Sequence, residues 1–226
     1  MLKTERMDRI RAALRAQGLT QMIVCDPKSV WYLTGVAVEP YERLLALYLP
    51  TEGEPVLFLN RLFNVPEPPC RTVWHTDTDK PVAQIAEVVD AGRPLGIDKE
   101  WPAKFLIPLM ETHPGMQVVL SSDCVDDCRA CKDAEEQTLM REASRINDAV
   151  NEAAKHYIKT GMTEREVAEF IDAQFRAHGC EGPSFTTIVS FGANAADPHH
   201  EPDDTVLKEG DCVLFDIGCV KDRYCS

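Results

Sequence analysis

Apolar and polar residues in the first half of the chain follow patterns that are typical of both helices and strands. Within residues 4–17, Met7, Ile10 and Leu14 lie three or four positions apart with charged residues between them, which predicts an amphipathic helix. Further helices are predicted at 81–89 and 101–111, and short apolar runs predict strands at 21–25, 44–49, 55–59, 95–97 and 117–120. Strands separated by helices indicate an α/β layer domain.

The pattern changes near Lys132, where one long apolar stripe begins. Its members lie three or four residues apart and predict a single long helix: Leu139, Ala143, Ile146, Val150, Ala153 and Tyr157. Gly161 is expected to end this helix, because glycine is favoured just after a helix. The domain boundary is expected within 122–133, and we divide the chain into domains 1–130 and 131–226.

A second helix is predicted to start at Thr163. The sequence Thr163-Glu164-Arg165-Glu166 has the form of a capping box, in which the Thr163 and Glu166 side chains each satisfy the other's free backbone N–H. Gly179 is expected to stop this helix, whose buried stripe comprises Val167, Phe170, Ile171 and Phe175. The segments 184–190 and 211–217 are strand-like.

Composition and charge exclude several classes of function. The 226 residues are 44% hydrophobic and 27% charged, values typical of a globular protein. The formal net charge of −13 repels nucleic-acid phosphates and anionic lipid, and no cluster of Lys and Arg offsets it. No apolar run is long enough for a membrane helix, which needs about 18 residues. The charged, amphipathic start lacks the apolar stretch of a secretory signal, so we expect a cytoplasmic protein without nucleic-acid or membrane partners.

The nine cysteines are expected to be reduced thiols, because no secretion signal accompanies them. Cys124, Cys128 and Cys131 have the spacing Cys-x3-Cys-x2-Cys of radical SAM enzymes, and three thiolates at that spacing could hold an iron–sulfur cluster. Cys128 and Cys131 could alternatively form a redox pair. However, the triad lies mid-chain in a charged stretch before the long helix, and no thioredoxin-like pattern surrounds it. We interpret the three residues as thiols at a domain junction.

Short motifs distributed along the chain resemble the creatinase and prolidase family in their order and spacing. The first half contains Tyr32-Leu33-Thr34-Gly35 after an Asp-Pro turn, Trp74 with Thr76-Asp77, and Leu95-Gly96-Ile97-Asp98. The second half contains Lys132 before Glu135-Glu136, Arg141-Glu142-Ala143, Gly161-Met162-Thr163-Glu164, Ser184-Phe185 with Ile188-Val189, Gly192-Ala193-Asn194-Ala195-Ala196, Pro198-His199-His200, and Gly210-Asp211 leading to Phe215-Asp216-Ile217-Gly218. The resemblance implies an α/β N-terminal creatinase-like domain followed by an α+β pita-bread domain, of which this chain holds an incomplete part.

Asp216 is the candidate metal ligand. It follows the apolar run Cys212 to Phe215, where an ionised carboxylate is costly unless it is paired, hydrogen-bonded or bound to a metal. The run alone also allows an Asp that merely closes a strand. The resemblance implies a two-metal site with Asp, Asp, His, Glu and Glu ligands, in which Asp216 binds one metal by both oxygens. The second Asp would fall one position past Ser226, so we expect this chain to be an inactive fragment that does not retain the metals.

His199 is the candidate catalytic and substrate-binding residue. It lies in the loop 196–202, which Pro198 and Pro202 stiffen. The resemblance implies that His199 contacts the substrate and helps to stabilise the tetrahedral intermediate without being a core metal ligand. The alternative is an ordinary surface histidine, and His200 is interpreted as a neighbour rather than a participant.

The reaction implied by the resemblance is dimetal-dependent hydrolysis of Xaa-Pro peptide bonds, by a homodimeric dipeptidase or aminopeptidase. Two divalent ions (Mn, Co or Zn) about 3.5–4 Å apart would activate a shared water and polarise the carbonyl. The alternatives are a creatinase-like amidinohydrolase without metal and a non-catalytic pita-bread binding protein. Strands 184–190 and 211–217 would lack their normal partners, so we expect poor solubility or partial unfolding after about residue 130.

Overall fold

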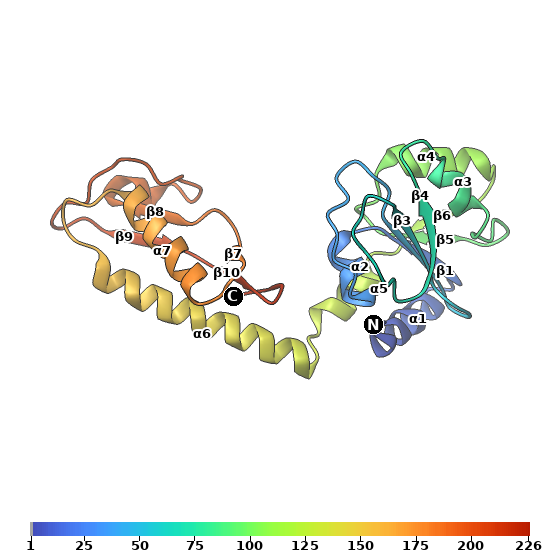
Figure 1. Cartoon of the computed structure of the whole chain (residues 1–226), viewed down its shortest axis with the longest axis horizontal. Coiled ribbons are helices and arrows are strands. Elements are labelled where there is room, and N and C mark those ends of the chain that lie inside the picture. The colour runs from blue at the N-terminus through green and yellow to red at the C-terminus, as the bar shows by residue number, and fades with distance from the viewer. Residues whose placement is uncertain (1) are drawn as a thin grey trace. The chain divides into compact units, whose positions relative to one another are not determined.

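The computed structural model describes residues 2–226, which divide into two compact units, one ending at Cys131 and the other comprising 132–226 (Figure 1). Each unit has its own hydrophobic core. None of the helices formed by residues 2–226 combines the length and apolar character needed to span a membrane.

A six-stranded mixed sheet forms the centre of the N-terminal unit (Figure 1). Its strand order is β4-β3-β2-β1-β5-β6. β2 pairs antiparallel with both β1 and β3, whereas the β3–β4, β1–β5 and β5–β6 pairs are parallel. The strands are β1 (Gln21–Val24), β2 (Ala46–Pro50), β3 (Val56–Asn60), β4 (Arg71–His75), β5 (Leu95–Ile97) and β6 (Val118–Leu120).

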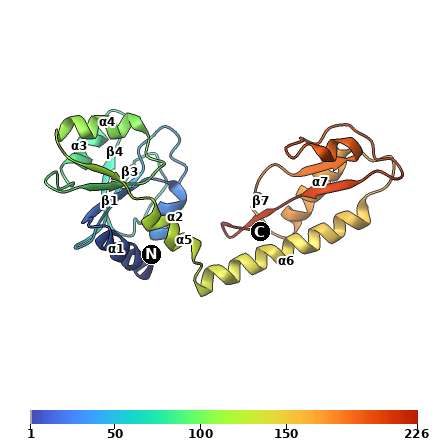
Figure 2. The same ribbon diagram turned by 180° about the vertical axis from the view of Figure 1, so that it is seen from behind.

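Helices cover both faces of this sheet, as Figures 1 and 2 show. Because side chains alternate between the faces of a strand, Met22 and Val24 pack into one core and Ile23 into the other. Helices α1 (Thr4–Ala16), α2 (Pro27–Thr34) and α5 (Asp123–Ala130) contribute to the first core, and α3 (Pro81–Ala86) and α4 (Ala103–Thr112) to the second. The unit is therefore a three-layer α/β/α arrangement.

The Asp26-Pro27 dipeptide differs from its prediction as a turn, because it begins helix α2. The Asp26 carboxylate accepts hydrogen bonds from the backbone N–H groups of Lys28 and Ser29, and Pro27 occupies the first turn, where its missing N–H costs nothing. Gly35 then ends the helix in the left-handed conformation, with φ 73°.

Strand β4 and helix α5 were also not predicted. Only the last residue of β4, His75, is fully buried, so β4 carries a weak apolar signal.

Two helices pack together in the C-terminal unit, α6 (Ala134–Tyr157) and α7 (Glu164–Ala177) (Figure 1). Their facing residues form the core, which includes Ala143, Ile146, Val150, Val167, Ile171 and Phe175. The rings of Tyr157 and Phe170 stack with centroids 3.8 Å apart at the end of the stripe. The remaining elements are β7 (Gly182–Pro183), β8 (Ile188–Phe191), the 3-10 helix η1 (Gly192–Ala196), β9 (Val213–Asp216), β10 (Cys219–Lys221) and β11 (Tyr224–Cys225).

The capping box of α7 is present, with Thr163 and Glu166 bonded to each other's backbone N–H groups. The prediction that Gly161 ends α6 is wrong. The helix stops at Tyr157 because Ile158 is extended (φ −60°, ψ 139°), and Gly161 instead supplies the left-handed residue (φ 96°) of the connection to α7.

Strands β8 and β9 are shorter than predicted and pair antiparallel with each other, with Ile188 opposite Asp216. They were expected to lie unpaired, so this pairing corrects the prediction for one edge of each strand. Exposed apolar side chains remain nearby, since Phe185 is 44% exposed and Leu214 is 36% exposed. The expected poor solubility therefore stays a prediction with a structural basis.

Candidate functional site

Asp216 is the last residue of β9 and lies on the outward face of that strand. Val213 and Phe215 pack against the core of the unit, whereas Leu214 and Asp216 are exposed. The carboxylate is in contact with solvent, so the cost expected for an ionised group within an apolar run does not arise in this structure. The role of Asp216 as a metal ligand stays a prediction.

His199 lies in the loop between η1 and Leu207, and its side chain is exposed. Its backbone N–H donates a hydrogen bond to Oδ1 of Asp197 over 3.0 Å. This short-range bond is typical of an Asx turn and fixes the loop just before the imidazole. Among the described residues, neither His199 nor Asp216 belongs to a group of three metal-ligand side chains, so the structure does not gather the two predicted site residues into one cluster.

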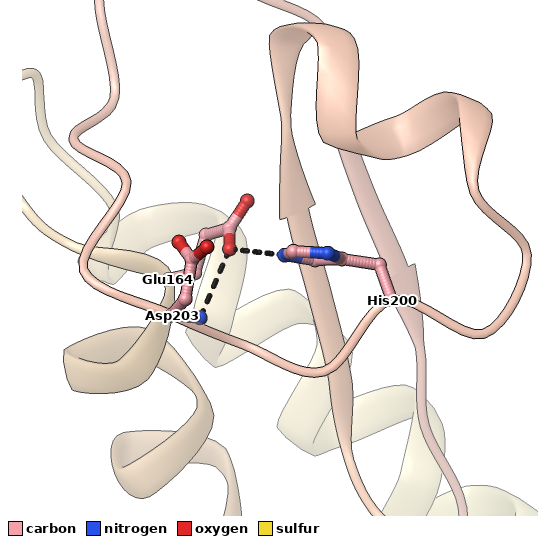
Figure 3. A group of neighbouring side chains, drawn as sticks. All are labelled: Glu164, His200 and Asp203. Atoms are coloured by element: carbon pink, nitrogen blue, oxygen red, sulfur yellow. Dashed lines mark hydrogen bonds and ion pairs between the residues drawn. The ribbon is translucent and has the colours of Figure 1, made fainter.

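A cluster of Glu164, His200 and Asp203 is brought together instead (Figure 3). Glu164 is the first residue of α7 and is fully buried, with 0% exposure. The His200 imidazole reaches it from the loop, with Nε2 donating to Oε2 of Glu164 over 2.7 Å. The backbone N–H of Asp203 donates to the same oxygen over 3.1 Å. Residues separated by up to 39 positions in the chain thus meet at one carboxylate.

The other oxygen of Glu164 is occupied as well. Oε1 accepts hydrogen bonds from the backbone N–H of Phe191 over 2.7 Å and from Nδ2 of Asn194 over 3.0 Å. The same Asn194 amide also donates to Oγ1 of Thr205, over 3.1 Å. A carboxylate accepts about four hydrogen bonds, so the four donors satisfy Glu164 completely. The position of Glu164 in the first turn of α7 adds the favourable field of the helix N-terminus.

The charges of the cluster perturb the titration of two of its members. The hydrogen bond to Glu164 raises the pKa of His200 and is the largest effect; desolvation opposes it, and the negative charges of Glu164, Asp203 and Asp197 each add a smaller increase. The hydrogen bonds from Thr205 lower the pKa of Asp203. The protonated form of His200 is therefore favoured more than in a free imidazole.

The ligand atoms of Glu164, His200 and Asp203 all lie within 4.8 Å of one another, which is a spacing that a metal ion could use. However, the two oxygens of Glu164 are saturated by protein donors, and a metal would have to displace at least the His200 bond. Asp203 Oδ1 is likewise occupied, because it accepts the backbone N–H of Thr205 over 2.7 Å. The internal hydrogen bonds account for this group without a cation, and we interpret it as a polar network that holds the loop.

Sequence reasoning missed Glu164 as a functional residue. The capping box drew attention to Glu166, which is exposed, and Glu164 looked like an ordinary acidic residue of a first helical turn. Its partners follow 27 to 39 residues later, so no local pattern could indicate them. The adjacent pair His199-His200 was the one available signal, since one of two neighbouring loop histidines can turn inward.

Cys124, Cys128 and Cys131 lie at α5 and its C-terminal end. Cys124 is buried and Cys131 is exposed, and the three do not form one of the ligand groups found among residues 2–226. Burial raises the pKa of Cys124 to about 11 and also raises that of Cys128. Because the thiolate is the metal-binding form, these protonated thiols are poor ligands for an iron–sulfur cluster.

A polar cavity of about 220 Å³ lies in the N-terminal unit at the carboxyl ends of β1, β5 and β6. Its charged walls are largely paired within the unit: Nη1 of Arg129 lies 3.1 Å from Oδ2 of Asp26, and Nζ of Lys99 lies 2.6 Å from Oδ2 of Asp126. Asp98 is also occupied, because it accepts the backbone N–H groups of Cys25 and Asp26. Because the charged groups around the cavity are already paired with each other, the cavity is a weaker candidate site than the loop of His199.

Comparisons with known proteins match both units. The model described as the creatinase/prolidase N-terminal domain matches residues 6–131, and that of metallopeptidase family M24 matches residues 138–226. A Staphylococcus epidermidis protein described as an uncharacterized peptidase is 29% identical over 221 residues, which are 96% of this chain and 62% of that protein.

Solved structures of other proteins are similar to this chain over nearly its whole length. Dipeptidase PepE from Mycobacterium ulcerans is 30% identical with a TM-score of 0.89, covering 99% of this chain and 62% of the other. A recombinant prolidase from Thermococcus sibiricus is 28% identical with a TM-score of 0.89, covering 100% and 64%. The chain thus spans less than two thirds of the length of each of these relatives. The predicted fold class is confirmed, and the chain belongs to the creatinase/prolidase family, with that family's N-terminal domain followed by part of an M24 metallopeptidase domain.

Proposed function

We propose that the protein to which this chain belongs is a dimetal-dependent peptidase that hydrolyses Xaa-Pro bonds, as a dipeptidase or an aminopeptidase. The observation that carries the proposal is the likeness to a dipeptidase and a prolidase over 99% and 100% of the chain, at 30% and 28% identity. A likeness that extends through both units covers the loop of His199 and the strand of Asp216, where the chemistry is expected.

Asp216 is proposed as a ligand to one of the two metals. Its exposed carboxylate at the end of β9 is a hard oxygen donor, and carboxylate ligands suit Mn, Co or Zn in sites with few histidines. Such a metal pair would supply an activated water and polarise the scissile carbonyl. No ligand group of three side chains within residues 2–226 includes Asp216, so a metal pair at Asp216 would need ligands beyond those that these residues gather.

His199 is proposed as the residue that contacts the substrate and stabilises the charge of the tetrahedral intermediate. Its imidazole is exposed, while its backbone is held by Asp197. An exposed side chain on a fixed backbone can meet a substrate without first being freed from other contacts. A proline-containing peptide is the proposed substrate, and a homodimer is the proposed assembly.

The test is hydrolysis of Xaa-Pro dipeptides and Xaa-Pro-Yaa tripeptides with added Mn, Co or Zn. It is measured on this chain and on the product of the complete reading frame that contains it. Activity of the complete product, lost on Asp216→Ala and His199→Ala, would support the proposal, and the peptide that is cut would separate dipeptidase from aminopeptidase. No activity with any metal would favour a creatinase-like amidinohydrolase or a binding protein. Activity of the 226-residue chain that survives Asp216→Ala would refute the ligand assignment.

A further inference from the structure

Two adjacent histidines of one loop have opposite environments. His199 is exposed, whereas the side chain of His200 is 16% exposed and is hydrogen-bonded to the buried Glu164. Figure 3 shows the His200 ring pointing at the carboxylate, with the backbone nitrogen of Asp203 on the same oxygen. The proposed function uses only the outer histidine, which leaves the inner one without a role.

The contacts of Glu164 act on both ends of the loop. Phe191 and Asn194 bind Oε1 at the start of the segment, and His200 and Asp203 bind Oε2 near its end. A fully buried carboxylate is stable only while its donors stay in place, because an unpaired buried charge is costly. The loop is therefore tied at several points to the first residue of α7, which is a rigid element.

His199 lies between Asn194 and His200, two residues that are hydrogen-bonded to Glu164. Its own N–H is held by Asp197, and the next residue along the chain is anchored by its side chain to Glu164. With both sides of the residue fixed, the backbone from which the His199 imidazole projects has little freedom to move. A catalytic group gains from such fixation, since a misplacement of about 1 Å can cost about 10²-fold in rate.

We propose that Glu164 and His200 form a positioning pair that sets the place and orientation of the His199 imidazole. The inference rests on the proposed function for its kinetic consequence, but the geometric claim concerns only residues of this chain. The raised pKa of His200 supports it, because an imidazolium donor to a carboxylate makes a stronger bond than a neutral donor.

The experiment compares three variants by two measurements, NMR of the His199 ring and steady-state kinetics. His200→Ala removes the donor, whereas His200→Gln keeps an N–H donor near the place of the imidazole Nε2. The control is His156→Gln, the same change at a histidine whose side chain is 81% exposed and bonded only at the surface. The NMR signals of the His199 ring are recorded with labelled histidines in the product of the complete reading frame, and also in the 226-residue chain if that chain is soluble. Steady-state kinetics on an Xaa-Pro substrate are measured in the product of the complete reading frame.

We expect His200→Ala to shift or broaden the His199 ring signals and to lower kcat by about tenfold to 10²-fold with a smaller change in KM. His200→Gln should restore most of the kcat and a sharp His199 signal, and His156→Gln should change neither. If His200→Ala does not fold, His200→Phe, which keeps a ring but has no N–H donor, takes its place: a low kcat in His200→Phe that His200→Gln restores supports the pair, and a wild-type kcat in both overturns it.

Two results would overturn the inference. One is a His199 spectrum and a kcat in folded His200→Ala that match those of the wild type. The other is a His200→Gln variant that is folded but as slow as a variant without the side chain. If the wild-type product does not cleave Xaa-Pro substrates, the proposed function fails, and the NMR comparison still decides whether the pair positions His199.

Discussion

The two units differ in how completely their own residues cover their sheets. In the N-terminal unit, all four residues of β1 and all five of β3 are buried, because helices pack on both faces of the sheet. In the C-terminal unit, β9 alternates between half-buried and exposed residues, and its outward face carries Leu214 and Asp216. The first unit thus buries its central strands with its own residues, whereas its edge strands β4 and β6 are less covered and Leu120 is 66% exposed. The candidate functional residues belong to the second unit, where a strand face and a loop remain open to a ligand.

The largest effects are expected from emptying either core. Phe58→Ala in β3 and Phe175→Ala in α7 each remove a fully buried ring, and each should cost about 3–5 kcal/mol of unfolding free energy. If the units are independent, each loss stays within its own unit. All three tryptophans, Trp31, Trp74 and Trp101, lie in the N-terminal unit, so tryptophan fluorescence reports the unfolding of that unit alone. The fluorescence midpoint in urea should fall for Phe58→Ala and stay unchanged for Phe175→Ala.

Circular dichroism follows the unfolding of both units, so it should detect the loss of unfolding free energy in Phe58→Ala and in Phe175→Ala. An equal fall of the fluorescence midpoint in both variants would show that the two cores unfold as one, and the contrast between the units would then not hold for stability.

The next largest effect is expected at the buried carboxylate of the C-terminal unit. Glu164→Ala leaves four donors without their acceptor and should cost about 3 kcal/mol. Glu166→Ala, two positions away, removes only an exposed capping partner and should cost about 1 kcal/mol or less. Urea unfolding followed by circular dichroism measures both, and comparable costs for the two variants would contradict the central role of Glu164.

Two glycines, Gly96 in the N-terminal unit and Gly218 in the C-terminal unit, lie so close to neighbouring atoms that an added methyl group would collide with them. A Cβ at Gly96 would lie 2.5 Å from Oγ of Ser121 and 3.2 Å from the carbonyl oxygen of Gln21, inside the buried sheet. Gly96→Ala should therefore cost about 1–3 kcal/mol. A Cβ at Gly218 would meet the buried Oγ of Ser184 at least as closely, as well as the side chain of Phe185, which is 44% exposed. We expect Gly218→Ala to cost about as much as Gly96→Ala in a thermal melt. A clearly smaller cost would show that the C-terminal unit relaxes around the new methyl group more easily than the N-terminal unit does.

The parts of the structure that local patterns define could be predicted from the sequence. The stripe Ala143, Ile146 and Val150 indicated α6, and Thr163 with Glu166 indicated the start of α7, because both signals lie within a few residues. Helix α2 was missed because an Asp-Pro pair is compatible with both a turn and a helix N-terminus. The end of α6 was misplaced because a glycine in the left-handed conformation can follow a helix directly or lie in the loop after it, and Gly161 lies in the loop.

The candidate site depended on the resemblance more than on its own residues. The local argument for Asp216 assumed burial, and the structure shows an exposed carboxylate. Glu164 and its donors lie 27 to 39 positions apart, so only the folded chain shows that they meet. Long-range polar networks of this kind have no sequence period, and neither helical nor strand patterns can indicate them.

The smallest expected effect is a pH dependence of the C-terminal unit between about pH 6 and pH 8, below the pKa of about 8.5 at which the buried thiols of both units would titrate in the unfolded chain. The hydrogen bond to Glu164 holds the pKa of His200 above its unfolded value of about 6.5. A group with a raised folded-state pKa contributes stability that is fully present below the unfolded pKa and is lost as the pH rises through the folded pKa. Unfolding of the C-terminal unit should therefore become easier from about pH 6.5 upward. Asp203, whose pKa is lowered, loses its contribution only in acid and does not interfere in this range.

Urea titrations between pH 6 and pH 8, followed by circular dichroism, measure this dependence, with tryptophan fluorescence recording the N-terminal unit in the same samples. His200→Gln cannot be protonated and should remove the His200 contribution, while His156→Gln, the exposed control, should leave the dependence in place. If the wild type and His200→Gln respond identically to pH, the pKa of His200 does not differ between the folded and unfolded states, and the hydrogen bond to Glu164 does not favour a protonated His200.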